Sequence, residues 1–222
     1  MARATSRHET AAVAVDVVLL TIEKGELSAF LVCLKEGPLR GKWAFPGGRV
    51  RLDEPLEDAA RRELREQTGL ADVYLEQLYT FGDPDRDPTS RVVSVAYFAL
   101  VPTAPALRRT ARYAAAAWFP VRALPALTYD HDRIAAMALE RLRAKLSYTN
   151  IAWSLLPRAF TLGDLQAVYE TILGRRLDRR NFRRKLLGLG LLRPLSRERR
   201  GAHRPATLYA FRSRRPLIAE VL

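Results

Sequence analysis

Residues 48–70, which read GRVRLDEPLEDAARRELREQTGL, decide the fold of this chain. The apolar residues in this stretch recur at three- and four-residue steps, at Leu56, Ala59, Ala60 and Leu64. This spacing predicts an amphipathic helix over residues 55–68, and Gly69 supplies a C-terminal stop signal. The stretch is therefore expected to form one short helix between two loops.

Three polar side chains of this helix lie close together around its axis. At about 100° per residue, Glu63, Glu66 and Gln67 fall within one arc of about 100°. Two carboxylates and an amide that point the same way suit Mg²⁺, which prefers a few carboxylates together with the oxygens of a substrate phosphate. The alternative is an exposed, charge-rich helix with ion pairs between residues four positions apart.

The same stretch resembles the Nudix box, whose signature is G-x5-E-x7-R-E-U-x-E-E-x-G-U, where U is a bulky aliphatic residue. Eight of the nine fixed positions match, namely Gly48, Glu54, Arg62, Glu63, Leu64, Glu66, Gly69 and Leu70. The resemblance implies a loop, helix and loop that hold a divalent metal against a diphosphate. It also implies an α+β fold in which an α/β/α sandwich is built on a mixed sheet.

Gln67 is the one fixed position that departs from the signature. In the family, the residue here is a glutamate that ligates the metal, while Glu63 and Glu66 complete the site and help to orient the attacking water. A glutamine oxygen can still coordinate, but the site loses one negative charge and should hold cations more weakly. We therefore expect a weakened Mg²⁺ site, impaired catalytic residues Glu63 and Glu66, and slow or absent hydrolysis of a bound ligand.

Two segments outside the helix resemble ligand-binding parts of Nudix proteins. Residues 43–48 read WAFPGG and resemble the segment that enters the box, where glycines let the backbone pass close to a ligand. Residues 83–88 read DPDRDP and resemble a loop that closes over ADP-ribose-like ligands, although Asp near Pro is also ordinary turn chemistry. His131 resembles a recurring Asp-His and is expected to be structural. The expected ligand-binding residues are Gly47, Gly48, Arg62, Asp83, Arg86 and Asp87.

The positive charge of the chain is concentrated in its last third. The 222 residues carry a net charge of +13, yet residues 1–149 hold 21 Lys and Arg against 19 Asp and Glu. Residues 150–222 hold 16 against 5. A strongly basic segment attached to a nearly neutral domain is typical of a polyanion binder, most often of nucleic acid. A solvated basic surface or a disordered tail is the alternative.

This basic part has the element order of a winged helix-turn-helix domain. Helices are expected over residues 151–156, 162–173 and 179–189, and strands over residues 191–195 and 207–211. In such a domain the third helix enters the major groove, where Arg pairs with guanine and Asn with adenine, while the wing contacts phosphate or the minor groove. The expected DNA-binding residues are Arg179, Arg180, Asn181, Arg183, Arg184, Arg199, Arg200, His203 and Arg204.

Together the two parts resemble the Nudix-related transcriptional regulators called NrtR, over residues 10–211. We expect a ligand-sensing Nudix domain at residues 1–146 and a DNA-binding domain at residues 147–222. The resemblance implies a homodimeric repressor that binds double-stranded operator DNA, usually of NAD biosynthesis or salvage genes, and senses ADP-ribose or a related nucleotide. Some relatives regulate sugar catabolism instead. The alternatives left open are an active ADP-ribose pyrophosphatase with a nucleic-acid-associating tail, and an inert scaffold.

The sequence predicts neither a membrane span nor export. The apolar run at residues 11–20 is interrupted by Asp16 and is shorter than the roughly 20 residues that a membrane helix needs. The first ten residues lack a signal-peptide pattern. The single cysteine, Cys33, excludes an intramolecular disulfide, so a cytoplasmic location is expected.

Overall fold

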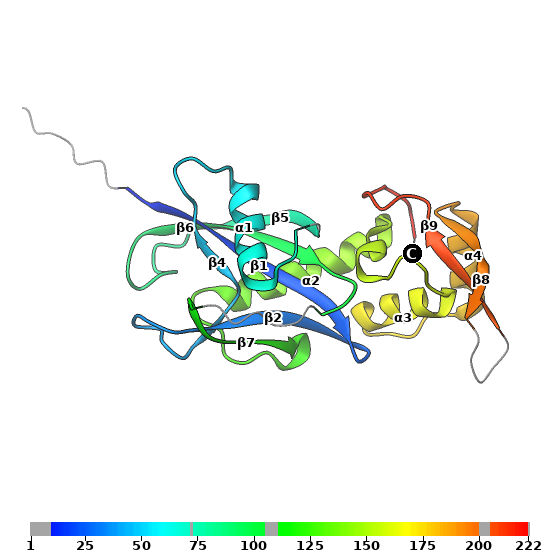
Figure 1. Cartoon of the computed structure of the whole chain (residues 1–222), viewed down its shortest axis with the longest axis horizontal. Coiled ribbons are helices and arrows are strands. Elements are labelled where there is room, and N and C mark those ends of the chain that lie inside the picture. The colour runs from blue at the N-terminus through cyan, green and yellow to red at the C-terminus, as the bar shows by residue number, and fades with distance from the viewer. Residues whose placement is uncertain (1–9, 72, 105–110, 200–204, 222) are drawn as a thin grey trace, which may run out of the picture.

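The computed structural model describes residues 10–71, 73–104, 111–199 and 205–221. The chain forms an elongated molecule with a sheet-containing part at one end and a small, mainly helical part at the other (Figure 1). Helix α2 (His131–Tyr148) runs from the first part into the second. None of the helices in the described residues is both long and apolar enough to cross a membrane.

The sheet has seven strands and is mixed. Its main path has the order β3-β2-β1-β6-β5, while β4 pairs with β1 and β7 pairs with β2. Among the paired strands of this sheet in the described residues, only β1 and β6 run parallel. The strands are β1 (Ala12–Glu23), β2 (Glu26–Leu34), β3 (Trp43–Ala44), β4 (Gly47–Arg49), β5 (Tyr74–Phe81), β6 (Val92–Leu100) and β7 (Tyr113–Pro120).

Strand β1 is covered on both faces. Val15, Val17 and Leu19 lie in the core cluster that includes α1 (Leu56–Thr68), whereas Val18 and Leu20 lie in the cluster that includes α2. A strand buried on both faces reads as a continuous apolar run, which is what this strand shows. The helix expected over residues 55–68 is confirmed as α1, and the mixed sheet between helices confirms the expected fold class.

Helix α2 joins the two parts through one continuous core. Its buried side chains include Ile134 and Ala138 beside the sheet, followed by Leu142 and Leu146. The same cluster continues into the second part through Ile151, Phe160, Leu165, Tyr169, Phe182, Leu186 and Phe211. The expected boundary between residues 146 and 147 falls within the last turn of α2, so that division stays a prediction.

The second part has the expected winged-helix order. It consists of the 3-10 helix η2 (Ile151–Leu155), α3 (Leu162–Leu173), α4 (Arg179–Gly188), β8 (Leu192–Arg199) and β9 (Ala206–Phe211). Thr161 and Asp164 form a reciprocal capping box at the start of α3, and Asp178 caps α4 by accepting from the Asn181 amide at 2.8 Å. Strand β8 reaches Arg199, four residues beyond the expected end.

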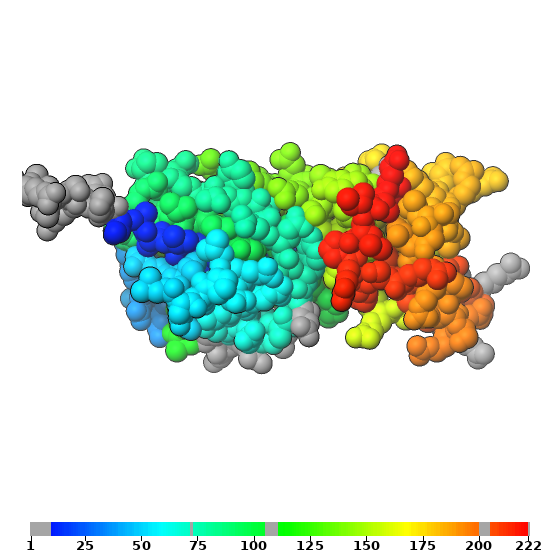
Figure 2. All heavy atoms as spheres, turned by 90° about the horizontal axis from the view of Figure 1, so that it is seen from above, coloured from blue at the N-terminus to red at the C-terminus, as the bar shows by residue number. Residues whose placement is uncertain are grey.

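The C-terminal segment ties down the end of α2. The Val221 amide donates to the Ser147 carbonyl at 2.7 Å, and the Ala219 amide donates to the Tyr148 carbonyl at 2.9 Å. The side-chain oxygen of Asn150 accepts from the Leu217 amide at 2.8 Å. Figure 2 shows this segment, in red, lying over the junction between the two parts. The junction is therefore a packed, hydrogen-bonded structure.

A buried ion-pair network fixes β1 against the loop at residues 83–88 and the start of α2. Arg86 donates to both carboxylate oxygens of Asp130, at 2.7 and 3.1 Å, and to Asp16 at 3.2 Å. Ser94 on β6 donates to the same carboxylate of Asp16 at 2.6 Å. All four residues are buried. Removing one member would leave a partner charge buried without its counter-charge, which is costly.

His131 completes this network. The Phe45 amide donates to His131 Nδ1 at 2.9 Å, so the ring proton lies on Nε2. That nitrogen lies 3.4 Å from Asp16 Oδ1. Burial alone would raise the pKa of Asp16, but His131, Ser94 and Arg86 outweigh burial and lower this pKa to about 2.

We predict that Asp16→Asn lowers the free energy of unfolding by about 2 kcal/mol at pH 7, because Arg86 loses a carboxylate partner. The folded-state pKa of Asp16 lies below its ordinary value of 3.8, so the stabilisation is complete above about pH 4. The stabilisation disappears as the pH falls towards 2. Urea unfolding of both proteins at pH 7, 4 and 3 measures this dependence.

The exposed neighbour Asp85 provides the control, because Asp85→Asn should leave stability unchanged at all three pH values. A stability difference between wild type and Asp16→Asn that stays constant as the pH falls would contradict the network.

Candidate functional site

A cleft of about 240 Å³ opens beside β1, β4 and the start of β7. Four of the six expected ligand-binding residues line it, namely Gly47, Gly48, Arg86 and Asp87. The lining also includes charged and aromatic side chains that the sequence did not single out, namely Lys35, Arg49, Arg112, Tyr113 and Tyr129. Cations beside aromatic rings suit a ligand that has both anionic groups and an aromatic base.

The two glycines allow close packing of protein groups against the backbone. A Cβ on Gly47 would overlap Asp16 and the Val15 carbonyl of β1, and a Cβ on Gly48 would overlap Glu63. Any larger residue at either position would push these groups apart. The backbone at these glycines is therefore closely approached, as expected. The groups that approach it are protein side chains and a carbonyl.

Arg62 is bound within the box. It donates to both carboxylate oxygens of Glu54, at 2.9 and 2.7 Å, and its Nη1 lies 2.8 Å from Glu63 Oε1. The hydrogen bonds from Arg62 lower the pKa of Glu54 to about 2, so this carboxylate stays charged at neutral pH. Arg62 thus fastens the loop before α1 to the helix, and its expected ligand contact stays a prediction.

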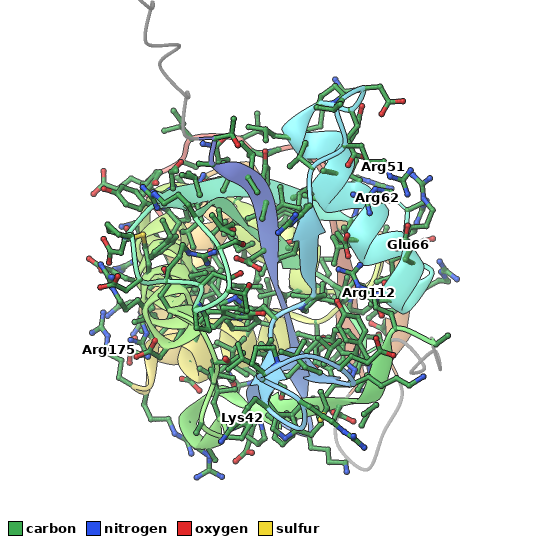
Figure 3. The ribbon with its side chains drawn as sticks, turned by 90° about the vertical axis from the view of Figure 1, so that its left-hand side faces the viewer. Lys42, Arg51, Arg62, Glu66, Arg112 and Arg175 are labelled. Carbon is green, nitrogen blue, oxygen red and sulfur yellow. The ribbon has the colours of Figure 1, made fainter. Side chains whose placement is uncertain are left out.

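Glu63 lies between two arginines. Its side chain is only 1% exposed, and its second oxygen accepts from Arg112 Nη1 at 2.7 Å. Arg112 Nη2 donates to the Gly47 carbonyl at 2.5 Å. Figure 3 shows Arg62, Glu66 and Arg112 together along one side of α1. Arg112 directly precedes β7 and lies outside any motif, so only the folded chain reveals its role.

The three expected metal ligands occupy different environments. Glu63 and Gln67 are buried on the inner face of α1, whereas the Glu66 side chain is 43% exposed. Within the described residues, no group of three or more His, Cys, Asp or Glu side chains is arranged to hold a metal ion. With Glu63 bound by two guanidinium groups, the arrangement does not fit Mg²⁺, which needs near-octahedral oxygen ligands and retains several waters.

The three expected residues of the loop at 83–88 point in different directions. Arg86 belongs to the buried network described above, and Asp83 pairs with Arg133 at the surface. Asp87 lines the cleft while its carboxylate accepts from the Thr89 amide at 2.8 Å and the Thr89 hydroxyl at 2.6 Å. This loop is therefore held by its own acidic side chains, as in ordinary Asx turns.

Tyr129 is the strained residue of the cleft. Its φ of 57° lies in the left-handed region, which a tyrosine seldom adopts. Its ring centre lies 5.2 Å from that of His131, and its side chain faces the cleft. Backbone strain of this kind costs on the order of 1–3 kcal/mol and tends to occur at binding sites.

A second candidate site is the outer surface of α4. Its exposed polar residues are Arg179, Arg180, Asn181, Arg184 and Lys185. Phe182 packs inward on Tyr169 with ring centres 5.1 Å apart, which keeps the basic face outward. The Arg184 guanidinium donates to Asn181 Oδ1 at 3.0 Å. Helix α4 and strand β8 lie at the end of the molecule away from the sheet-containing part (Figure 1).

The remaining expected DNA-binding residues differ in their placement. Arg183 is half-buried at the edge of α4. Arg199 is paired with Asp164 of the α3 capping box, with an Nη2–Oδ2 distance of 2.5 Å, so it holds the wing against α3. Arg200, His203 and Arg204 lie outside the described residues.

Known proteins resemble both parts of the chain. Residues 10–139 match the family described as the NUDIX domain, and residues 152–211 match the NrtR DNA-binding winged helix domain. The curated ADPR responsive transcriptional repressor NtrR of Acinetobacter baylyi is 35% identical over 201 residues, which cover 89% of this chain and 80% of that protein.

Two solved structures of Shewanella oneidensis NrtR extend this similarity. The complex with a 27mer DNA has a TM-score of 0.78 at 32% identity and covers 90% of this chain and 93% of that one. The NUDIX domain complexed with ADP ribose has a TM-score of 0.55 at 34% identity and covers 60% of this chain and 90% of that one. This chain therefore belongs to the NrtR family of Nudix-related transcriptional regulators.

Proposed function

We propose that this protein is a repressor that binds operator DNA through α4 and the wing and senses ADP-ribose or a related nucleotide in its cleft. The observation that carries the proposal is the exposed face of α4, which presents arginines and an asparagine with nothing packed over them in the described residues. Arg and Asn are the side chains that pair bidentately with guanine and adenine in the major groove.

The cleft supports a nucleotide ligand. Arg49 and Lys35 bring positive charge that suits a diphosphate, and Tyr113 and Tyr129 bring rings that suit a base. The Acinetobacter baylyi relative is an ADPR responsive repressor, and the NUDIX domain of the Shewanella oneidensis relative has been crystallised with ADP ribose. ADP-ribose or a close relative is therefore the effector that we propose.

Helix α2 supports coupling between the two sites. Its first residue, His131, lines the cleft, and its last turns pack against the winged helix. Arg143 on this helix also donates to the Ile172 carbonyl of α3 at 3.1 Å. A ligand that favours one position of α2 over another would shift the placement of α4, and a difference of a few kcal/mol would suffice.

Several further properties belong to this proposal. The protein acts as a homodimer on a near-palindrome whose half-sites lie about one helical turn, or a multiple, apart. Its targets are genes of NAD biosynthesis or salvage, with sugar catabolism as the second possibility, and it works in the cytoplasm. Any Mg²⁺ is held weakly, because Gln67 replaces a charged ligand, and hydrolysis is slow or absent.

The test of the effector is a fluorescence anisotropy titration of operator DNA with the protein, with and without ADP-ribose. We expect ADP-ribose to weaken operator binding at least about fivefold, which corresponds to about 1 kcal/mol of coupling. AMP and ribose 5-phosphate serve as matched fragments that should have little effect. Operator binding that ignores ADP-ribose would exclude it as the effector.

For DNA recognition, we predict that Arg180→Ala and Arg184→Ala each weaken operator binding by about 1–3 kcal/mol, because each loses a contact to a base edge. Their binding to random DNA should change much less. Arg40→Ala removes the same charge from an exposed loop of the first part and should change neither affinity. Equal losses on operator and random DNA would show that α4 does not read bases.

Arg199→Ala provides a contrast with these variants. Because Arg199 orients the wing through Asp164, we predict that its loss weakens binding to operator and random DNA to a similar extent, by about 1 kcal/mol. A loss confined to the operator would instead assign Arg199 to base recognition.

For the enzyme alternative, we predict that Gln67→Glu, made together with Arg112→Gln so that Glu63 is released from that guanidinium, raises the rate of AMP release from ADP-ribose by about tenfold in the presence of Mg²⁺, since it restores a charged ligand. Gln67→Ala in the same background should give no increase. If the double variant with Gln67→Glu stays folded and gives no increase either, the position is not the one that limits turnover.

A further inference from the structure

Arginine side chains occupy both oxygens of the Glu63 carboxylate. Arg62 Nη1 lies 2.8 Å from one oxygen, and Arg112 Nη1 lies 2.7 Å from the other. Hydrogen bonds between ions at these distances are about twice as strong as neutral ones. Because the Glu63 side chain is also only 1% exposed, a divalent ion that approaches this carboxylate has to displace one of the two guanidinium groups.

Arg112 also binds a backbone oxygen of β4. Its second nitrogen donates to the Gly47 carbonyl, which also accepts from the Tyr113 hydroxyl at 3.3 Å. One planar guanidinium thus bridges a carboxylate of α1 and a carbonyl of β4. A Cβ on Gly48 would come within 2.8 Å of Arg112 Nη2, so the guanidinium packs directly on backbone. Carboxylate and carbonyl oxygens are the ligands that hard cations prefer.

Gln67 and Arg112 together carry the same charge as a glutamate at position 67 together with a bound Mg²⁺ ion. A glutamate at position 67 together with Mg²⁺ would carry +1, and Gln67 together with the Arg112 guanidinium also carries +1. Exchanging only Gln67 for glutamate, or only the guanidinium for Mg²⁺, would change the local charge by one unit. A diphosphate thus meets the same net charge in both cases. The positive charge comes from Mg²⁺ in one case and from Arg112 in the other.

We propose that Arg112 is the resident cation of this cleft, standing where related Nudix proteins hold a divalent ion, and that the cleft binds a diphosphate-bearing nucleotide without added metal. The Arg112 side chain is 43% exposed, which leaves part of the guanidinium open to such a ligand. The ligand class rests on the proposed function, whereas the position of the cation rests on the contacts of Arg112 alone.

The first test measures Mn²⁺ binding to the ligand-free, full-length protein by electron paramagnetic resonance. Wild type should show no saturable binding below about 1 mM, because Glu63 is already occupied. Arg112→Gln should gain a site at least about tenfold tighter than any in wild type. Arg112→Lys keeps a cation beside Glu63 and should continue to exclude the metal.

Arg51→Gln is the matched control, since it removes the same charge from an exposed side chain near Glu54. It should gain no Mn²⁺ site. Circular dichroism establishes that each variant is folded. Micromolar binding of Mn²⁺ by wild type, or unchanged binding in folded Arg112→Gln, would overturn the proposal.

The second test measures ADP-ribose affinity by calorimetry in EDTA and in Mg²⁺. Wild type should bind equally well, within about twofold, in both conditions, and Arg112→Gln should bind about tenfold more weakly in EDTA. Wild-type binding that requires Mg²⁺ would overturn the proposal. A failure of ADP-ribose to act on operator binding would count against the proposed effector, while the Mn²⁺ measurement would still decide the role of Arg112.

Discussion

One apolar stripe on α2 holds this molecule together. Ile134 and Ala138 bury against the sheet, and Leu142 and Leu146 continue the same core into the winged helix. Burying a side chain such as leucine stabilises a protein by roughly 1.5–3 kcal/mol, so both parts depend on this helix. His131, the first residue of α2, lines the cleft. Because packed cores deform little, movement of α2 at the cleft must also move the helices that rest on its other end.

The buried carboxylates near the cleft are paired with arginines of the protein itself. Arg86 is shared between Asp16 and Asp130, and the box arginine and Arg112 share Glu63. Catalysis of phosphate chemistry needs groups that are aimed at charge developing in the transition state. Carboxylates already bound by guanidinium groups are poorly suited to that task. The same arrangement is well suited to a fixed binding site, which agrees with sensing as the function.

Local patterns in the sequence predicted the elements, whereas contacts between distant residues required the folded chain. The box helix and the capped helix after Thr161 follow from apolar spacing and capping residues. Arg112 could not be assigned from sequence, because its partner Glu63 is 49 residues away. The buried ion pair between Arg86 and Asp130 likewise joins residues far apart in the sequence. The same is true of the hydrogen bond between Asn150 and Leu217 of the C-terminal segment. Long-range ion pairs have no periodic signature in a single sequence.

Hydrogen exchange followed by mass spectrometry at rising urea concentrations tests the shared core most directly. If α2 unites the two parts, the slowest amides of β1 and of α3 should become exposed in one step, with the same dependence on urea. ADP-ribose should then protect both sets together. Exposure of α3 at a clearly lower urea concentration, with β1 still protected, would show that the winged helix unfolds independently and would contradict the account.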